Sequence, residues 1–371
     1  MNTPDILIIG GGIAGLSAAT ALSKHAQVTV LEAEEQIGFH SSGRSATMLH
    51  YALGDRLVRA LTLASRPFFD NPPKEFGSLG HRMPVLIHAR EDERDALDAL
   101  EAELSLFAQL ERLDTRGLHQ LCPLLKEDAL YGIADRNGIR LDPHALLHGN
   151  LRQVRSRGGA VHTGQRVASI ERSGGIWAVG SDKGETFSAP IIVNAAGSWA
   201  DEVAGLAGVL PLRLAPKRRT IITFDAPPGT ELDGLPFAKT VGDELYFAPE
   251  SGRLFASPMD EVPSDPCDAQ PDEFEVALAA YRMEERTTVK VDRIHSRWAG
   301  LRTFTPDRHP AAGFAPDAEG FFWLAGQGGF GLQTSPAMAS ITASLITGRP
   351  WPVTDVGAED LDPGRFVRQP A

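Results

Sequence analysis

ILIIGGGIAG, at residues 6–15, joins four apolar residues to three glycines and the first turn of an apolar helix. The apolar run indicates a buried strand, and we expect the helix to continue to about Lys24. Gly10 allows the sharp turn, Gly12 lets the backbone approach a pyrophosphate, and Gly15 lets the helix pack closely on the strand. The free N–H groups and the positive end of the helix dipole then face the phosphates. The stretch therefore predicts the phosphate-binding turn of a dinucleotide site.

A second strand, Val28–Leu31, ends in Glu32, which lies 20 residues after Gly12. A carboxylate at this place can accept hydrogen bonds from an adenosine ribose, and it disfavours a 2′-phosphate. A GxGxxG run alone is weak evidence, because a tight turn beside an acidic strand end would look similar. Here strand, turn, helix, second strand and acid occur at the spacing of one βαβ unit, which favours the dinucleotide site. The apolar N-terminus lacks a basic leader and holds this motif, so we expect it to remain as the first strand.

The composition narrows the class of protein. Of the 371 residues, 42% are hydrophobic, enough for a substantial core, and the net charge of −12 argues against a nucleic-acid partner. No apolar run reaches the roughly 18 residues of a membrane span, so we expect no transmembrane segment. The two cysteines, Cys122 and Cys267, form no CxxC or Cys/His cluster. They predict free thiols of a reduced, cytoplasmic protein without a disulfide or a metal site.

Residues 38–46 read GFHSSGRSA, a run of small and hydroxylated side chains just before a predicted helix over residues 55–69. Backbone amides and hydroxyl groups at this density suit a second phosphate or a ring contact. The competing interpretation is a serine-rich loop without a ligand. Its place one βαβ unit after the phosphate-binding turn favours contact with a cofactor.

Two later apolar strands share the pattern of the first. Residues 190–199 (PIIVNAAGSW) pass from apolar to small residues, as in a central parallel strand whose carboxyl end opens onto a ligand crevice. Residues 320–325 (GFFWLA) predict another buried strand, and the glycines of residues 326–331 lead into a helix over Ser335–Ile346. Residues 213–300 instead alternate strand-like pieces with loops rich in Pro, Gly and Asp, which predicts an antiparallel sheet.

These patterns alternate along the chain and predict an α/β fold. A doubly wound, Rossmann-like dinucleotide-binding domain would carry an inserted substrate domain with a mixed or antiparallel sheet. The nucleotide-binding parts would be residues 1–75, 143–212 and 301–371, and the substrate parts residues 76–142 and 213–300.

Six motifs resemble one known family. They are GGGIAG with Glu32, HSSGRSA, VNAAGSWAD, PKRRT, WAGLRTFTPD and GQGGFGLQTSPAM, in this order over nearly the whole chain. Together they are similar to the FAD-dependent D-amino-acid oxidase and glycine oxidase (DAO) family, and within it to the bacterial D-arginine dehydrogenases. The resemblance implies FAD in the doubly wound domain and a substrate domain that closes over the isoalloxazine ring. The cysteine that holds the flavin in sarcosine oxidases has no counterpart in residues 326–331, so we expect the FAD to be noncovalent.

The resemblance also implies which residues contact the cofactor. The first glycine motif would hold the pyrophosphate, the acid after the second strand the adenosine, the serine-rich run the diphosphate and flavin, and the last glycine segment the pyrimidine edge of the ring. In this family a helix pointed at the flavin stabilises the anionic reduced ring, and the helix starting near Thr334 fits that role. The implied cofactor-binding residues are Gly10, Gly12, Ile13, Ala14, Gly15, Glu32, Ala33, His40, Ser41, Ser42, Gly43, Arg44, Ser45, Ala46, Met48, Val167, Gly197, Trp199, Gly328, Gly329, Gly331, Leu332, Gln333 and Thr334.

Substrate contacts follow from the same resemblance. The family holds the substrate carboxylate with arginine and tyrosine, for which Arg302 is the strongest match, followed by Arg219 and Tyr246. A guanidinium can bind a carboxylate through two parallel hydrogen bonds and fix the α-carbon over the flavin. No side chain is expected to act as a catalytic acid or base, because geometry and flavin electronics carry the chemistry. Further candidates for substrate contact are Gly329, His50, Tyr51 and Leu53.

The chain departs from the D-arginine dehydrogenases at the substrate tail. Those enzymes pair the basic tail with a glutamate, whereas residues 81–85 read HRMPV and contain no acid. In the lid, Met48 and Leu53 stand where those enzymes carry a histidine and a tyrosine. An unpaired cationic tail would be costly in such a pocket, so we predict an apolar or neutral tail.

By resemblance, the chain is an FAD-dependent amino-acid dehydrogenase or oxidase that passes a hydride to flavin N5. We expect a D-amino acid as the substrate and oxygen or a quinone as the electron acceptor. The alternative is a glycine-oxidase-like enzyme for an N-substituted, N-carboxymethyl amino acid with an apolar tail, in a biosynthetic pathway. A 2-hydroxy-acid dehydrogenase and a flavin-binding module without turnover are weaker hypotheses.

Overall fold

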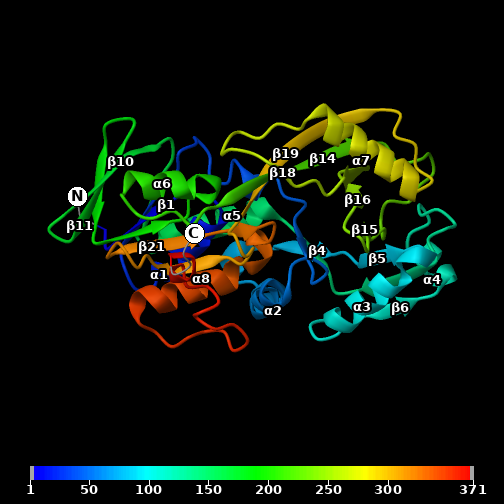
Figure 1. Cartoon of the computed structure of the whole chain (residues 1–371), viewed down its shortest axis with the longest axis horizontal. Coiled ribbons are helices and arrows are strands. Elements are labelled where there is room, and N and C mark those ends of the chain that lie inside the picture. The colour runs from blue at the N-terminus through cyan, green and yellow to red at the C-terminus, as the bar shows by residue number, and fades with distance from the viewer. Residues whose placement is uncertain (1–3, 368–371) are drawn as a thin grey trace.

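The computed structural model describes residues 4–367 and holds one large sheet in each half of the molecule (Figure 1). The first sheet has six strands in the order β20-β21-β13-β1-β2-β9 and is parallel except for β20. The predicted apolar strands lie side by side at its centre, which confirms the doubly wound α/β prediction. Its strands are β1 (Ile6–Ile9), β2 (Val28–Leu31), β9 (Ala160–His162), β13 (Ile191–Asn194), β20 (Ala311–Phe314) and β21 (Phe321–Ala325).

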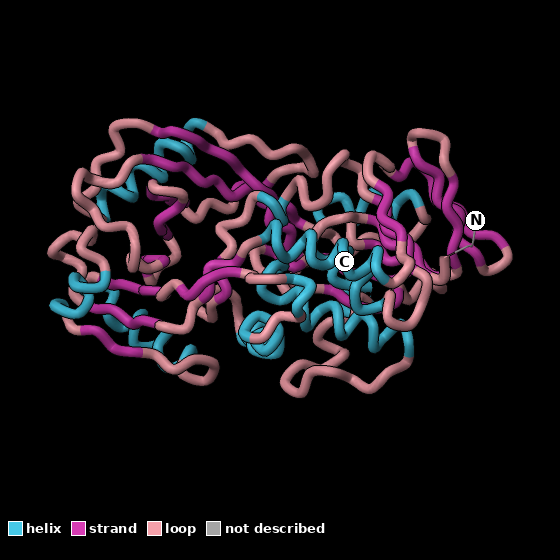
Figure 2. Tube along the Cα trace, turned by 180° about the vertical axis from the view of Figure 1, so that it is seen from behind, coloured by secondary structure: helices cyan, strands magenta, loops and turns pink. Residues whose placement is uncertain are grey.

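Alternate residues of β1 enter two cores on opposite faces of this sheet. Ile6 and Ile8 pack with four helices, whereas Leu7 and Ile9 pack with a three-stranded sheet and a short helix. All four are buried, as a strand covered on both faces requires. Figure 2 shows the helices gathered near the middle of the molecule and the three-stranded sheet at one end. The helices are α1 (Ile13–Leu22), α2 (Arg56–Asp70), α5 (Pro143–Ser156) and α8 (Gly331–Thr347) on one face, and β10 (Val167–Ser173), β11 (Ile176–Ser181), β12 (Thr186–Ala189) and α6 (Ala200–Leu206) form the other layer.

The second sheet is mixed, as predicted. Its strands run in the order β22-β19-β14-β17-β16-β15-β5-β7-β6, with β18 beside β14, and only the β15–β5 pair is parallel. Helices α3 (Arg94–Leu104), α4 (Thr115–Leu121) and α7 (Glu273–Arg286) accompany it. The strands are β5 (Val85–Ala89), β6 (Glu111–Leu113), β7 (Tyr131–Asp135), β14 (Ala215–Phe224), β15 (Phe237–Thr240), β16 (Tyr246–Glu250), β17 (Arg253–Ser257), β18 (Val262–Pro263), β19 (Ile294–Phe304) and β22 (Gln327–Gly328).

Short elements connect the two halves. A small sheet with the order β3-β8-β4 ties the segment after the serine-rich run to the connection before α5. β19 continues to Phe304 and pairs with β22, so the large sheet also takes residues from beyond position 300. The five-part domain division itself stays a prediction. The remaining elements are β3 (Met48–Leu49), β4 (Gly80–Arg82), β8 (Ile139–Leu141), α9 (Gly364–Val367) and the 3-10 turns η1 (Ser41–Gly43), η2 (Lys74–Phe76), η3 (Glu91–Glu93) and η4 (Gly197–Trp199).

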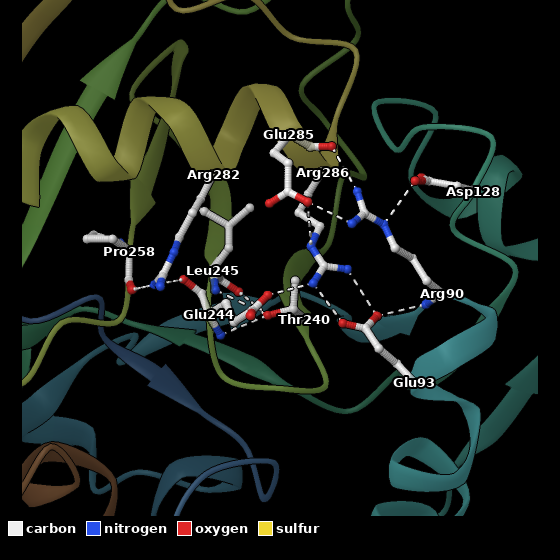
Figure 3. Close-up of polar contacts among 10 residues, drawn as sticks. All are labelled: Arg90, Glu93, Asp128, Thr240, Glu244, Leu245, Pro258, Arg282, Glu285 and Arg286. Carbon is white, nitrogen blue, oxygen red and sulfur yellow. Dashed lines mark hydrogen bonds and ion pairs between the residues drawn. The ribbon is translucent and has the colours of Figure 1, made fainter.

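A network of ion pairs locks α7 onto the far end of the large sheet (Figure 3). Arg286, the last residue of α7, lies 2.7 Å from Glu93 and 2.5 Å from Glu244. Arg90 lies 2.7 Å from Glu285 and 2.9 Å from Asp128. These contacts join α7 to the start of α3 and to the β15–β16 turn, and they are far in the chain from the predicted cofactor motifs.

Two predicted elements differ from the structure for local reasons. The apolar strand predicted within residues 190–199 ends at Asn194, because the Asn194 side chain accepts a hydrogen bond from the Ala196 N–H and donates one to the Ala200 carbonyl, which folds the next residues into η4. Helix α8 begins at Gly331, before the predicted Ser335. Its first-turn N–H groups need no acceptor within the helix, so glycines can occupy that turn.

Candidate functional site

A cavity opens at the carboxyl ends of β1, β2 and β13, where an open parallel sheet binds its ligands. This first cavity receives the phosphate-binding turn, the acid after β2, part of the serine-rich run and the start of α6. The predicted cofactor residues in its wall are Gly10, Gly12, Glu32, Ala33, His40, Ser41, Ser42, Val167, Gly197 and Trp199.

Gly10, Gly12 and Gly15 of the glycine motif have different structural roles. A Cβ at Gly10 would lie 2.3 Å from the Ala195 carbonyl oxygen, and Gly10 has a φ of +112°. A Cβ at Gly15 would lie 1.9 Å from the Gly10 carbonyl oxygen. Gly15 therefore lets α1 pack closely on the turn, and Gly10 lets the turn pack against the end of β13. At Gly12 the nearest atom to a Cβ would be Ser42 Oγ, 3.3 Å away. Gly12 therefore keeps backbone open toward the cavity.

The N-terminus of α1 faces this cavity without a capping side chain from Gly12. The Ile13 N–H donates to Ser42 Oγ at 3.0 Å, which ties the serine-rich run to the helix end. An exposed helix N-terminus with glycine backbone is a favourable place for phosphate oxygens.

Glu32 is fixed by the main chain. Its two carboxylate oxygens accept hydrogen bonds from the N–H groups of Gly11, at 2.7 Å, and Glu34, at 2.8 Å. Burial raises the pKa of the carboxyl group despite these two bonds. Each oxygen keeps a lone pair, so the side chain can still accept from a ribose hydroxyl at the cavity edge.

A second cavity adjoins the first, between the parallel sheet and the large sheet. The two cavities share the lining residues Gly12, Ser41, Ser42, Ala195 and Gly197. Helix α8 starts at this cavity and has no side-chain cap at Phe330, so its free N–H groups and positive dipole end face the space. The predicted cofactor residues in this wall are Gly12, Ile13, Ala14, Ser41, Ser42, Arg44, Ser45, Ala46, Gly197, Gly328, Gly329, Gly331 and Leu332.

Arg302 of β19 presents an unpaired guanidinium to the second cavity. Burial and the neighbouring Arg219 lower its pKa to about 10, so it remains a cation at neutral pH. The guanidinium packs on Gly329, where a Cβ would lie 2.8 Å from Arg302 Cζ. Within residues 4–367, no side chain or carbonyl forms a hydrogen bond or an ion pair with it.

Three further donors line the same cavity without partners in the described part of the chain. Arg219, 6% exposed, donates through Nε to the Asp260 carbonyl at 2.6 Å, but its Nη1 has no acceptor in the described part of the chain. The hydroxyl of Tyr246, a residue 1% exposed, is likewise unpaired there, and so is Nε2 of Gln327. No acidic side chain lines this cavity among the described residues. Buried donors without acceptors are costly, and a bound carboxylate would satisfy them.

Eight predicted site residues do not line either cavity. His50 and Tyr51 line a separate small cavity beneath β5, and Leu53 lies in no cavity wall described for the chain. The pairing of β3 with β8 turns this segment toward the core, where the His50 ring packs 5.4 Å from Phe237. The other five are Gly15, Gly43, Met48, Gln333 and Thr334, of which Gln333 and Thr334 lie inside α8.

His50 is neutral in the folded protein. Its Nδ1 accepts from the Ala52 N–H at 3.1 Å, and burial, with the charges of Lys239 and Arg302, lowers its pKa to about 3. A neutral ring outside the second cavity gives no support for a catalytic acid.

The sequence reasoning missed several lining residues. Gln327 lies within the predicted glycine segment but was not expected to have a free donor. Ile221 lines the cavity two residues after Arg219, and strand alternation places both on one face, a signal that was present in the sequence. Gly300, Leu301 and Thr303 line it because β19 runs along the cavity.

Other site types receive no support from residues 4–367. No group of three or more His, Cys, Asp or Glu side chains there is placed to hold a metal ion. No helix in that part of the chain has the length and apolarity to cross a membrane. Cys122 is buried in the core of the large sheet and Cys267 is exposed, and neither lines the two cavities.

Comparison with known proteins agrees with this geometry. The sequence model of the family described as "FAD dependent oxidoreductase" (DAO) matches residues 5–345. The tRNA 5-methylaminomethyl-2-thiouridine biosynthesis bifunctional protein MnmC of Burkholderia pseudomallei is 26% identical over 406 residues, covering 98% of this chain and 59% of that protein. The chain therefore spans less than two thirds of the length of this relative.

Solved structures share the fold over the whole chain. L-proline dehydrogenase from P. horikoshii has a TM-score of 0.86 at 22% identity and covers 99% of this chain and 98% of its own. Iminodiacetate oxidase from Chelativorans sp. BNC1 has a TM-score of 0.80 at 22% identity, with 96% and 98% covered. At these identities the likeness establishes the fold.

Proposed function

Because the chain belongs to the family of FAD-dependent oxidoreductases, we propose that it oxidises an amine next to a carboxylate by hydride transfer to N5 of noncovalently bound FAD. One observation carries the proposal. The unpaired Arg302 guanidinium, Arg219 Nη1 and the Tyr246 hydroxyl line one cavity, which adjoins the cavity of the phosphate-binding turn. That arrangement suits a carboxylate held beside a dinucleotide cofactor.

The residues present fit FAD. The N-terminus of α1 with Gly12 would hold the pyrophosphate, Glu32 the ribose, and the segment Gly328–Leu332 with the start of α8 the ring. Neither cysteine lines the first or the second cavity, which supports noncovalent binding of FAD. When bound, the flavin supplies the hydride acceptor.

The chain's own side chains bind and orient the substrate. Arg302 would take the carboxylate through two parallel hydrogen bonds, and Tyr246 and Arg219 would donate to its remaining lone pairs. This fixes the α-carbon in one position relative to the ring. Among the described residues, no acidic side chain lines the second cavity that could pair with an ammonium group or take its proton. The substrate amine would therefore bind in its neutral form, which needs no protein base.

For the substrate class we propose a D-amino acid with an apolar or neutral side chain. The cavity wall contains Ile221, Leu301 and Leu332 and three arginines, of which only Arg302 has no partner among the described residues. A cationic tail would meet the unpaired charge of Arg302 and no free carboxylate, because Asp260 and Glu261 already lie 3.9 and 3.7 Å from Arg219. That is unfavourable in a site with little water.

The second candidate is an N-carboxymethyl amino acid. The observation that favours it is the surplus of donors, because Gln327 Nε2 and two guanidinium groups can serve more than one carboxylate. Iminodiacetate, named for the structural neighbour, is itself an N-carboxymethyl amine, and the product named for the MnmC relative contains a secondary amine.

An anaerobic screen of the purified yellow protein tests the proposal. Bleaching of the flavin absorbance is followed after addition of D-Leu, D-Met, D-Phe, D-Arg, their L-enantiomers, glycine, sarcosine and N-carboxymethyl amino acids. Rapid bleaching by apolar D-amino acids supports the first candidate, and bleaching only by N-substituted glycines supports the second. Preference for D-Arg would contradict the reading of the cavity, and no bleaching at all would favour a flavin-binding module.

Acceptor, location and partners remain proposals. We infer that the reduced enzyme passes electrons to oxygen or a quinone, in the cytoplasm and without a nucleic-acid partner. The net charge of −12 supports the last point, although the MnmC relative is named for tRNA modification. Reoxidation by air compared with reoxidation by a soluble quinone separates the two acceptors, and a gel shift with tRNA checks the partner.

A further inference from the structure

The guanidinium of Arg44 reaches across from the cofactor half to the large sheet. Its Nη1 donates to the main-chain oxygens of Ala269, at 3.1 Å, and Ala299, at 3.3 Å. Its Nη2 lies 2.5 Å from Asp268, while the Arg44 side chain is 16% exposed. Both terminal nitrogens of Arg44 are thus bonded to residues of the substrate side, although Arg44 belongs to the loop 41–46 that lines the second cavity.

Strand β19 also forms hydrogen bonds with the loop 41–46. Trp298 Nε1 donates to the Arg44 carbonyl at 3.1 Å, and Ser41 Oγ donates to the Leu301 carbonyl at 2.6 Å. Between them lies Gly300, where a Cβ would be 3.4 Å from Arg44 Cβ, so the loop and the strand are in van der Waals contact. The contacted residues 298–301 directly precede Arg302 in the chain.

The register of the sheet makes this contact relevant to the substrate. Gly300 pairs with Arg219 across β14, and Arg302 follows two positions later on the same face of β19. A shift of the strand at Gly300 would therefore move Arg219 and Arg302 relative to the loop. The same loop is tied to the phosphate-binding turn by the Ser42 to Ile13 hydrogen bond.

We propose that Arg44 is a positioning residue that sets Arg302 relative to the flavin, so that FAD binding and carboxylate binding are coupled through the loop 41–46. The proposal rests on the function proposed above. A ligand that orders the loop also orders β19, and each ligand then raises the affinity for the other by the same factor. Arg44 acts through hydrogen-bond geometry, because its donors are already occupied by Asp268 and two carbonyls.

Acetate titration of the FAD-loaded protein tests the coupling. The probe carries a carboxylate and no amine, and its binding is read from the shift of the flavin absorbance spectrum. We expect Arg44→Met to raise the dissociation constant of acetate about tenfold, within the usual range of coupling. Arg44→Lys should be nearly as weak, because it keeps the charge but cannot bond three acceptors. In an Arg302→Met background, Arg44→Met should cause no further loss.

Matched controls separate positioning from general damage. Arg297 lies on the same strand in an exposed ion pair, 2.7 Å from Glu273, and Arg297→Met should leave acetate binding unchanged. If the Arg44 variants prove unstable, Ser41→Ala can take their place. It removes a single hydrogen bond to β19 and should raise the dissociation constant of acetate two- to threefold.

Three results would overturn the proposal in distinguishable ways. Unchanged acetate affinity in FAD-loaded Arg44→Met protein would remove Arg44 from the coupling and leave the proposed function intact. Full affinity in Arg44→Lys protein would show that charge alone is needed. A wild-type flavin spectrum that ignores carboxylates would overturn the proposed function and this proposal together.

Discussion

The two adjoining cavities are built in different ways. The first is built from main chain and from short motifs, and its acid, Glu32, is already held by two backbone N–H groups. The second is built from side chains on β14, β16, β19 and β22, and four of these side chains carry a donor without an acceptor in the described chain. We infer that the cofactor is recognised by backbone shape and the substrate by charges that the protein leaves unpaired. The comparison yields four predictions.

The largest effect should come from Arg302. Arg302→Met removes the only full charge in the second cavity that has no partner among the described residues, and kcat/KM should fall about 100- to 1000-fold, or roughly 3–4 kcal/mol. FAD content should stay at the wild-type level, because the backbone-built first cavity is untouched. Steady-state kinetics and the ratio of flavin to protein measure both quantities.

Arg302→Lys sharpens this prediction. Lysine keeps the charge but loses the two parallel hydrogen bonds, so it should recover only part of the lost activity. Wild-type kinetics in either variant would remove Arg302 from the substrate site and break the distinction between the cavities.

The same distinction explains which features the sequence could predict. The strand at residues 6–9, its glycine turn and helix α2 with its N-cap Asp55 depend on local signals, and the structure has them within a residue of the predicted places. The carboxylate site depends on the β14–β19 register, which pairs residues about 80 apart in the chain, such as Arg219 with Gly300. The sequence shows that positions 219 and 302 are arginines, but it does not show that Arg219 Nη1 and the Arg302 guanidinium have no acceptor among the described residues.

Long-range pairing also determines where the lid residues lie. His50 and Tyr51 were expected at the substrate by resemblance alone, and that contact stays a prediction. The pairing of Met48 with Arg140 places this segment against the core, where the His50 ring packs beside Phe237. No local pattern in residues 48–53 reveals that pairing.

The second prediction separates packing from ligand approach within the first cavity. Gly15→Ala places a Cβ 1.9 Å from the Gly10 carbonyl oxygen and should destabilise the apoprotein by about 2–3 kcal/mol. Gly12→Ala meets only Ser42 Oγ at 3.3 Å, so it should cost about 1 kcal/mol or less, yet weaken FAD binding strongly. Denaturant unfolding of both apoproteins and FAD titration by flavin fluorescence test this pair. Equal loss of stability in the two variants would contradict the division of roles.

The third prediction uses an unpaired polar group that lies outside both cavities. His88 on β5 is 1% exposed, and neither of its ring nitrogens has a hydrogen-bond partner among residues 4–367. The charges of Arg286, Glu93, Arg90 and Lys239 act on it. Burial, with the Arg286 charge, lowers its pKa to about 3. His88 lines neither of the two cavities. If unpaired polar groups mark ligand sites only where they line a cavity, replacing His88 should change the stability of the folded protein and leave its activity unchanged.

The sign of the pH effect follows from the lowered pKa. The unfolded chain takes up a proton on His88 below about pH 6.5, but the folded protein does not, so stability is complete above that pH and falls as the pH drops toward 3. At pH 5 the loss should be about 2 kcal/mol. His88→Leu should flatten the dependence of the melting temperature on pH between 6.5 and 4, whereas replacement of the exposed His144 should not.

The smallest effect should come from Tyr246, whose hydroxyl is unpaired in the second cavity. Tyr246→Phe removes one neutral hydrogen bond to the substrate carboxylate, so KM should rise about 3- to 10-fold, or roughly 1 kcal/mol. The melting temperature should stay the same or rise, since the variant loses a buried hydroxyl that no described residue satisfies. Tyr131→Phe is the matched control, because the Tyr131 hydroxyl donates to Glu91 at 2.8 Å, on the surface. A lower melting temperature with unchanged KM would show that the Tyr246 hydroxyl serves the fold, and the unpaired donors of the second cavity would then lose their value as markers of the substrate.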